Sequence, residues 1–175
     1  NASFSARTLR QVVKLKQRRW LFWPAYYTED AVKDDTDRLR EFYYNQGFLD
    51  HKIAAQTQRS ADGSKVHVLF LLEEGPVYHV SEVVFTGQRL YTAEQLRAKV
   101  KVREGEVYKK PKVDRDAREL VQIYREQGYV DATVQQSGTF LPASEDDLVK
   151  VTFNIQEGRQ FRIGQIEITG NETTK

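Results

Sequence analysis

The sequence predicts an α+β protein built from tandem units with the order strand, helix, helix, strand, strand. Three segments recur at nearly constant spacing along the 175 residues. FYYNQGFLD at 42–50 returns as IYREQGYVD at 123–131, FLLEEG at 70–75 returns as FNIQEG at 153–158, and FTGQ at 85–88 returns as ITGN at 168–171. The start positions differ by 81, 83 and 83 residues, which indicates a structural repeat.

The repeats divide the chain into three parts. Residues 77–159 hold one complete unit, which we expect to fold as a three-stranded mixed sheet with two helices on one face. Residues 1–76 form a unit without its first strand, and residues 160–175 form the first strand of a further unit. Because the chain begins with Asn1 and contains no Met, we expect it to be part of a longer protein.

The first strand of each unit has one irregularity in its pattern. In Tyr78–Phe85, apolar residues alternate as far as Val80 and resume, one residue out of step, at Val83. Phe161–Ile168 shows the same shift at the same place. An alternation that slips by one residue is typical of a β-bulge, so we expect a bulge in each of these strands.

Two helices follow the first strand. Thr92, with Gln95 three residues later, forms a capping-box pattern that predicts the start of the first helix, and Pro111 suits the first turn of the second. The second helix has apolar positions at spacings of four, three and four residues, which places them on one stripe. In the two copies these positions are Val113, Ala117, Leu120 and Tyr124, and Val32, Thr36, Leu39 and Tyr43.

A glycine ends the second helix of each unit, and a pair of strands follows. We expect Gly47 and Gly128 to take the left-handed conformation that closes a helix without a steric clash. The strand pairs are expected at His51–Arg59 with Lys65–Leu72, and at Ala132–Gly138 with Leu148–Ile155. The later strand of each pair is the more apolar, which predicts that it is central and that the earlier strand is an edge.

The composition argues against several classes of protein. The longest apolar runs are far shorter than the roughly 20 residues that cross a bilayer, and the chain has no cysteine for disulfides or thiolate metal sites. A net charge of +2 does not favour nucleic-acid binding. His51, His67 and His79 lack the spacing of a metal site. With no phosphate-binding loop or catalytic triad evident, we predict neither an enzyme nor a cofactor.

Units of this order and length resemble POTRA modules of BamA-type outer-membrane assembly proteins. The resemblance depends on a Tyr-x-x-x-Gly-aromatic motif at the end of the second helix, a Glu-Gly pair after the last strand, and Gly-Asn after the next first strand. The matching residues are Tyr43, Gly47, Phe48, Tyr124, Gly128, Tyr129, Glu74, Gly75, Glu157, Gly158, Gly170 and Asn171, while Gln88 replaces the usual asparagine. The resemblance implies tandem POTRA modules in the periplasm of a diderm bacterium, with an outer-membrane β-barrel further along the parent chain.

An aromatic segment lies between the two helices of the first unit. It reads WLFWPAYY at 20–27 and follows a basic stretch without acidic residues. We expect most of it to fill the core, with Trp20 and Trp23 as candidates for an exposed patch beside Arg18 and Arg19. Such a patch would meet a partner or a membrane surface, and a simply solvated basic face is the alternative.

The expected function is the binding of other proteins, without catalysis. The edge strands would bind unfolded outer-membrane proteins by adding their strands to the sheet, because backbone hydrogen bonds make little demand on sequence. The residues expected to take part are Ile53, Ala55, Thr57, Ala132, Val134 and Gln136. Accessory assembly lipoproteins are expected as further partners. The alternatives are the arm of a related secretion or translocation pore, and a membrane-surface module.

Two segments lack a predicted neighbour within the chain. Val66–Leu72 has the pattern of a central strand but one expected partner, and Phe161–Ile168 has no unit after it. Pairing the two within one chain would require the two units to fold back sharply on each other. We therefore expect self-association, in which 161–168 of one copy pairs beside 66–72 of another, head to tail.

Overall fold

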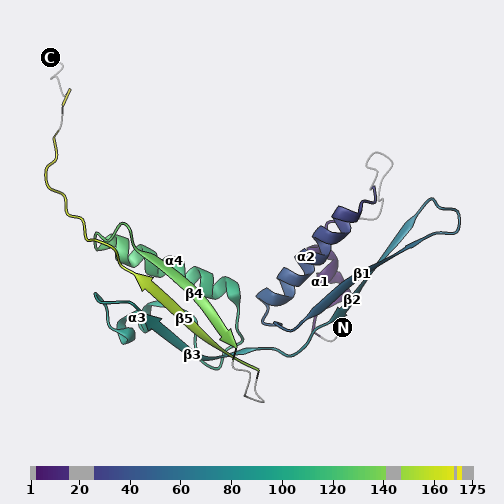
Figure 1. Cartoon of the computed structure of the whole chain (residues 1–175), viewed down its shortest axis with the longest axis horizontal. Helices are drawn as coiled ribbons and strands as arrows, with labels where there is room; N and C mark the ends of the chain where they lie inside the picture. The colour runs from purple at the N-terminus through teal and green to yellow at the C-terminus, as the bar shows by residue number, and fades with distance from the viewer. Residues whose placement is uncertain (1–2, 16–25, 141–146, 168, 171–175) are drawn as a thin grey trace.

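The computed structural model describes residues 3–15, 26–140, 147–167 and 169–170. These residues form two modules joined end to end (Figure 1). The elements are α1 (Ala6–Val12), α2 (Glu29–Asn45), β1 (Lys52–Arg59), β2 (Val66–Glu73), β3 (His79–Thr86), α3 (Ala93–Lys99), α4 (Lys110–Glu126), β4 (Thr133–Phe140) and β5 (Leu148–Gln156). The expected α+β order is confirmed through β5, and β1, β2, β3 and β4 each begin one residue later than predicted, while the described residues 161–167 of the expected next strand form no strand.

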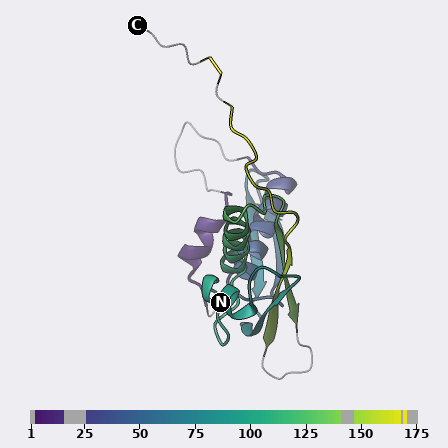
Figure 2. The same ribbon diagram turned by 90° about the vertical axis from the view of Figure 1, so that its left-hand side faces the viewer.

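The second module contains the predicted three-stranded mixed sheet. Its order is β3-β5-β4, with β3 parallel and β4 antiparallel to β5. The apolar β5 is central and the polar β4 is an edge, as its composition indicated. The register of β3 shifts between Val80 and Glu82, which confirms the predicted bulge. Figure 2 shows α3 and α4 together on one side of this sheet.

Local sequence signals set the helix boundaries of the second module. Thr92 and Gln95 form the reciprocal capping box that starts α3, and Pro111 lies in the first turn of α4. The predicted stripes of α4 and α2 both face the interior. Their buried members are Val113, Ala117, Leu120 and Tyr124, and Val32, Thr36, Leu39 and Tyr43.

Both predicted helix-ending glycines have positive φ angles. Gly47 has a φ of 92° and Gly128 a φ of 85°. The aromatic residue that follows each glycine packs back on the last turn. The rings of Tyr43 and Phe48 lie 5.6 Å apart, and those of Tyr124 and Tyr129 lie 6.1 Å apart. These contacts complete a Schellman-type helix end in each module.

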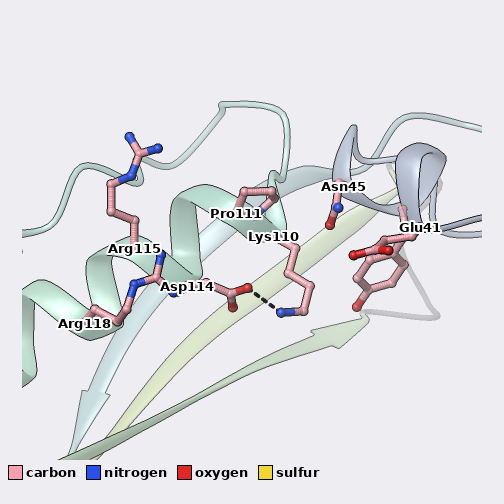
Figure 3. A pocket seen from close by; sticks show the side chains of 8 residues that line it. Glu41, Asn45, Lys110, Pro111, Asp114, Arg115 and Arg118 are labelled. Carbon is pink, nitrogen blue, oxygen red and sulfur yellow. Dashed lines mark hydrogen bonds and ion pairs between the residues drawn. The ribbon is translucent and has the colours of Figure 1, made fainter. Parts of the chain in front are cut away.

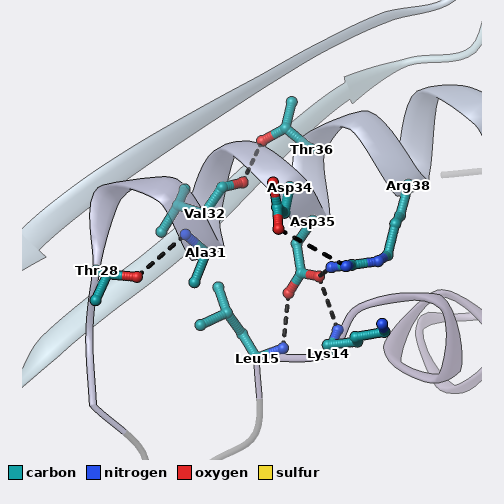
Figure 4. A network of polar contacts seen from close by, with 9 residues as sticks. All are labelled: Lys14, Leu15, Thr28, Ala31, Val32, Asp34, Asp35, Thr36 and Arg38. Carbon is teal, nitrogen blue, oxygen red and sulfur yellow. Dashed lines mark hydrogen bonds and ion pairs between the residues drawn. The ribbon is translucent and has the colours of Figure 1, made fainter.

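A buried aspartate joins the two helices of each module, and the sequence did not indicate it. Asp35 follows Glu29 and Asp30, the acidic residues in the first turn of α2, but lies beyond that turn. The Asp35 carboxylate instead accepts hydrogen bonds from the backbone N–H groups of Lys14 (2.8 Å) and Leu15 (2.7 Å) after α1 (Figure 4). It therefore fixes α1 against α2.

The equivalent carboxylate in the second module does the same work. Asp116 is fully buried and accepts from the backbone N–H groups of Lys101 (2.8 Å) and Val102 (2.7 Å), which follow α3.

Arg38 adds an ion pair to Asp35 at 2.6 Å. Burial acts to raise the pKa of Asp35, but its backbone hydrogen bonds and Arg38 outweigh that effect, so the pKa is lowered.

The glutamate of each Glu-Gly pair is also structural. Glu157 accepts hydrogen bonds from the backbone N–H groups of Arg89 (2.7 Å) and Leu90 (2.8 Å), in the loop after β3. Glu74 accepts from the backbone N–H of Ser3 (3.2 Å) and from the Tyr43 hydroxyl (3.0 Å). Each glutamate thus ties the end of its module's last strand to the segment that enters the first helix.

Candidate functional site

The free edges of the two sheets are the candidate functional site. In the second module, the outer side of β3 is partly covered by the segment 105–108. The N–H of Val80 donates to the Glu106 carbonyl at 2.8 Å, and the N–H of Gly105 donates to the Val80 carbonyl at 2.8 Å. Among the residues that the structure describes, no strand pairs with the outer side of β4. The more open edge of this sheet is therefore β4.

Strand β4 lacks the features that usually prevent an edge from pairing. Its sequence, TVQQSGTF, contains no charged residue and no proline. It pairs with β5 over eight consecutive residues without a register shift. Charges, prolines and bulges are the common protections of edge strands. An uncharged, regular edge of this length is suited to accept another strand.

The hairpin turn of the first module shows which residues of β1 face the free edge. The N–H of Ser60 donates to the carbonyl of Lys65 at 2.9 Å, so this pair is bonded toward β2. In an antiparallel ladder, alternate residues direct both backbone groups to the same side. Residues of even number in β1 therefore bond β2, and Ile53, Ala55 and Thr57 direct their N–H and C=O groups toward the free edge.

The repeat transfers this assignment to β4. At the offset of 81 residues, Ile53 corresponds to Val134 and Ala55 to Gln136. The N–H of Ala132 donates to the Tyr129 carbonyl at 3.1 Å, so it does not bond β5 either, in agreement with the same alternation. Val134 and Gln136 thus direct their backbone groups outward, while Ala132 lies just before β4.

The six predicted residues differ in their side chains. Ile53 and Ala132 are buried in the cores of their modules. Ala55 and Val134 are half-buried, and Thr57 and Gln136 are exposed. The Gln136 side chain donates through Nε2 to Asp114 Oδ1 at 2.6 Å, which links β4 to α4. At these positions it is the backbone, more than the side chains, that a partner would reach.

The two edges differ within the described residues, where an arginine bridges the edge of β1 and none bridges the edge of β4. Arg40 on α2 donates through Nη2 to the carbonyl of Ile53 at 3.0 Å. The corresponding residue of α4 is Val121, which has no hydrogen-bonding side chain. Sequence reasoning missed this contact, although aligning the two repeats would have shown an arginine opposite a valine.

The module junction is held by backbone contacts that the glycines permit. The N–H of Tyr78 donates to the Gly47 carbonyl at 2.9 Å, and its hydroxyl donates to Asp50 at 2.7 Å. A Cβ atom on Gly47 would lie 2.8 Å from the carbonyl oxygen of Tyr108. The hydrogen bond to Asp50 raises the pKa of Tyr78 to about 12. Gly47 is therefore needed for the junction as well as for the helix end.

A shallow groove lies where α2 meets α4, beside the junction (Figure 3). Its volume is about 430 Å³, and both charge signs line it. Lys110 pairs with Asp114 at 2.5 Å inside it. The lining residues are Glu41, Tyr44, Asn45, Lys110, Pro111, Asp114, Arg115 and Arg118. This groove was not predicted, because it forms only when the two modules are joined.

The predicted surface patch falls in a part of the chain without a description. Trp20, Trp23, Arg18 and Arg19 lie outside the described residues. Where the description resumes, Tyr26 is 79% exposed and Tyr27 is 37% exposed. Exposure of the two tryptophans therefore stays a prediction.

Two kinds of feature are absent from the described ranges. Within residues 3–15, 26–140, 147–167 and 169–170, no group of three or more His, Cys, Asp or Glu side chains could hold a metal ion. No helix of the same residues has the length and apolar character needed to cross a membrane.

Comparison with known proteins agrees with the repeat and the fold. The chain matches the family model described as POTRA, surface antigen variable number repeat, over residues 1–75 and 78–158. A relative in Treponema pallidum is 30% identical over 154 residues, which is 83% of this chain and 18% of that protein. The outer membrane protein assembly factor BamA of Neorickettsia risticii is 28% identical over 182 residues, which is all of this chain and 24% of that protein.

The fold is also found in a solved structure. The crystal structure of Haemophilus influenzae BamA POTRA3-5 superposes with a TM-score of 0.64 at 21% identity, covering all of this chain and 69% of that one. The chain is thus built of tandem α+β repeat modules. It belongs to the POTRA family, and it spans about a fifth to a quarter of the length of the curated relatives it matches.

Proposed function

We propose that this chain is the periplasmic POTRA arm of a BamA-type outer-membrane protein assembly factor in a diderm bacterium, and that it binds unfolded outer-membrane proteins by strand addition. The relatives that match the chain over most of its length include assembly factors of this name. The edge of β4 is the main binding site, and the edge of β1 is the weaker one.

The observation that carries the proposal is the unprotected edge of β4. It offers eight residues of regular strand with neither charge nor proline. Outer-membrane proteins share β-strand character but little sequence, so a site made of backbone donors and acceptors suits them. Each site of this kind binds weakly, and two modules in one chain raise the overall affinity.

A matched pair of substitutions tests the site. Gln136→Pro removes an N–H that faces outward and leaves the β4–β5 ladder intact, because an edge tolerates proline on its free side. Gln136→Ala removes the same side chain and keeps that N–H. We expect a labelled peptide with the alternating pattern of an outer-membrane strand to bind the wild type and Gln136→Ala alike, and to bind Gln136→Pro at least ~5-fold more weakly.

The circular dichroism spectra and melting temperatures of both variants serve as the control for folding. Equal peptide affinity in the two folded variants would exclude strand addition at β4. If the peptide binds but the parent protein moves its client across the membrane rather than into it, the arm belongs to a secretion or translocation pore instead. Accessory assembly lipoproteins are the further partners that we propose for these surfaces.

A second role is favoured by Tyr26. This side chain is 79% exposed next to the aromatic and basic segment 18–25. Exposed aromatic and basic residues together suit the interface of an anionic membrane. Flotation with vesicles of anionic and of neutral lipid tests this role: binding to the anionic vesicles, lost in a Trp20→Ser/Trp23→Ser variant, supports it, and no binding to either excludes it.

A further inference from the structure

One flank of α4 borders the free edge of β4. Asp114 on this helix accepts a hydrogen bond at 2.6 Å from the side chain of Gln136 on β4. Helix positions four, seven and eleven residues further along lie on the same face as Asp114. They are Arg118, Val121 and Arg125, and we call these four residues the α4 flank. The flank therefore lies on the side where a strand would join β4.

The first module supports this placement. The position of Val121 is occupied in α2 by Arg40, whose Nη2 donates to the carbonyl of Ile53 on the free edge of β1 at 3.0 Å. Ile53 corresponds to Val134 of β4, so a side chain at this helix position points to the edge of its sheet. Arg40 also pairs with Asp37 at 2.8 Å. The charge of the arginine is thus matched within its own helix.

The arginines of the α4 flank have no such match. Asp114 is paired with Lys110 at 2.5 Å, on the next turn toward the start of the helix (Figure 3). Arg118 and Arg125 are exposed, and neither pairs with an acidic side chain among the residues that the structure describes. The flank therefore offers two uncompensated positive charges beside an uncharged strand.

The geometry of a sheet brings a partner's side chains to these charges. Successive side chains of a strand point to opposite faces, so every second residue of a strand added to β4 lies on the helix side. Gln136 and Val134 mark this side, because Gln136 bonds to α4 and Val134 packs against the core. Carboxylates on the helix side of the added strand would meet Arg118 and Arg125, whereas lysines there would be repelled.

We propose that Arg118 and Arg125 select the strand that joins β4, and that they favour strands whose helix-side residues are Glu or Asp. This inference rests on the proposed addition of a strand at β4 and names the class of strand. The backbone of β4 provides affinity for any strand, and the two arginines rank strands by the charge on one face. Exposed ion pairs are weak, so the preference is modest and falls with added salt.

Three peptides test the preference on the full chain. They share one alternating sequence and differ only in the residues of one face, which are Glu, Gln or Lys. In fluorescence anisotropy at low ionic strength, we expect the Glu peptide to bind at least ~3-fold more tightly than the Gln peptide, and the Lys peptide to bind most weakly. Higher salt should bring the three affinities together.

Two variants assign the preference to the α4 flank. Arg118→Glu/Arg125→Glu should reverse the order of the three peptides, and the milder Arg118→Gln/Arg125→Gln should bind all three alike. The control Lys99→Glu/Lys101→Glu makes the same change of charge at two exposed residues at the end of α3, the helix that packs against β3. It should keep the wild-type order. Circular dichroism confirms that each variant is folded.

The outcomes separate this inference from the proposed strand addition. If all three peptides bind equally and Gln136→Pro weakens each of them, strand addition stands and the selection by charge is wrong. If no peptide binds in a way that Gln136→Pro weakens, strand addition at β4 fails and the selection fails with it. An order that the control variant also reverses would assign the preference to net charge and overturn the role of the two arginines.

Discussion

The guanidinium of Arg40 donates a hydrogen bond of 3.0 Å to the main-chain carbonyl of Ile53, across the free edge of β1. That carbonyl is among the acceptors that an added strand would use, because the alternation of the ladder directs it outward. Val121 stands at the equivalent position of α4, and no described residue makes a comparable bridge to β4. The two modules therefore offer edges of unequal availability.

Arg40→Val should make the edge of β1 resemble that of β4. We expect this variant to gain peptide affinity at β1 by about 0.5–1.5 kcal/mol, the net value of one hydrogen bond. Nuclear magnetic resonance shifts of the β1 amides during a peptide titration measure the change. Lys33→Val is the control, since it removes a positive charge from the same helix and Lys33 bonds to no described residue. A gain of the same size in the control would show that charge, and not the bridge, is responsible.

Gly47→Val should destabilise the chain by well over 1 kcal/mol. A β-branched residue is strained at a φ of 92°, and its Cβ would lie 2.8 Å from both the Tyr108 carbonyl oxygen and Val107 Cγ1. Thermal unfolding followed by circular dichroism measures the loss. Gly63→Val gives the comparison, because Gly63 also has positive φ, at 70°, but nothing lies within 4 Å of its Cβ position.

If the two glycine variants lose equal stability, the close approach at the junction contributes nothing and only the backbone conformation matters. Gly128→Val should behave like Gly47→Val. Its Cβ would lie 2.5 Å from the carbonyl oxygen of Phe161. Small-angle scattering of the Gly47→Val variant should also show a changed angle between the modules, since the backbone of the second module has to move away.

Asp35 should make the stability of the first module sensitive to acid. Its pKa in the folded chain lies below the value of 3.8 expected when unfolded. A carboxyl group whose pKa is lower in the folded chain stabilises the fold at pH values above its pKa in the unfolded chain. That stability is lost as the pH falls through its pKa in the folded chain. We therefore expect the free energy of unfolding to fall as the pH drops below about 4.

Asp35→Asn separates this effect from general acid unfolding. The amide can accept only through its oxygen, so one of the N–H groups of Lys14 and Leu15 loses its partner, at a cost of about 1–3 kcal/mol. Urea unfolding between pH 3 and pH 7 should show lower stability for the variant at neutral pH and a smaller dependence on acid. An unchanged pH dependence would assign the acid effect to other carboxylates, among them Glu74 and Glu157, whose pKa values are also lowered.

Tyr78→Phe should loosen the junction without unfolding either module. The substitution removes the 2.7 Å hydrogen bond to Asp50 and keeps the aromatic ring and the backbone bond to Gly47. We expect a loss of about 0.5–1.5 kcal/mol and a wider distribution of inter-module orientations, measurable by residual dipolar couplings. Phe161, which stands at the equivalent position, already lacks the hydroxyl. Couplings identical to those of the wild type would show that the backbone contact alone holds the junction.

Local patterns predicted most of the fold because each acts within a few residues. Residues close together in sequence predict each helix boundary or buried helix face. Examples are the capping box at Thr92, the proline at 111 and the apolar stripe that ends at Tyr124. The bulge between Val80 and Glu82 was visible as a slip in the alternation. The repeat then made each assignment twice, so that a weak pattern in one copy was supported by the other.

The features that the sequence did not predict depend on contacts between distant segments. Asp35 looked like one acid among several, and only the folded chain brings it to the N–H groups that follow α1. The bond from Arg40 to Ile53 joins a helix to a strand 13 residues away, and the groove beside Lys110 needs both modules. The direction of the backbone groups of Ile53, Ala55 and Thr57 follows from the turn at Ser60, and their role in binding stays a prediction.

The two linkages Tyr78–Gly47 and Phe161–Gly128 are made by main-chain atoms, and this affects how tandem modules can diverge in sequence. A connection made of peptide groups is inherited unchanged when surface side chains drift. The side chains of β1 and β4 can therefore change over evolutionary time without tilting one module against the next. The side chains of the edge strands and the relative orientation of the modules can therefore vary independently during evolution.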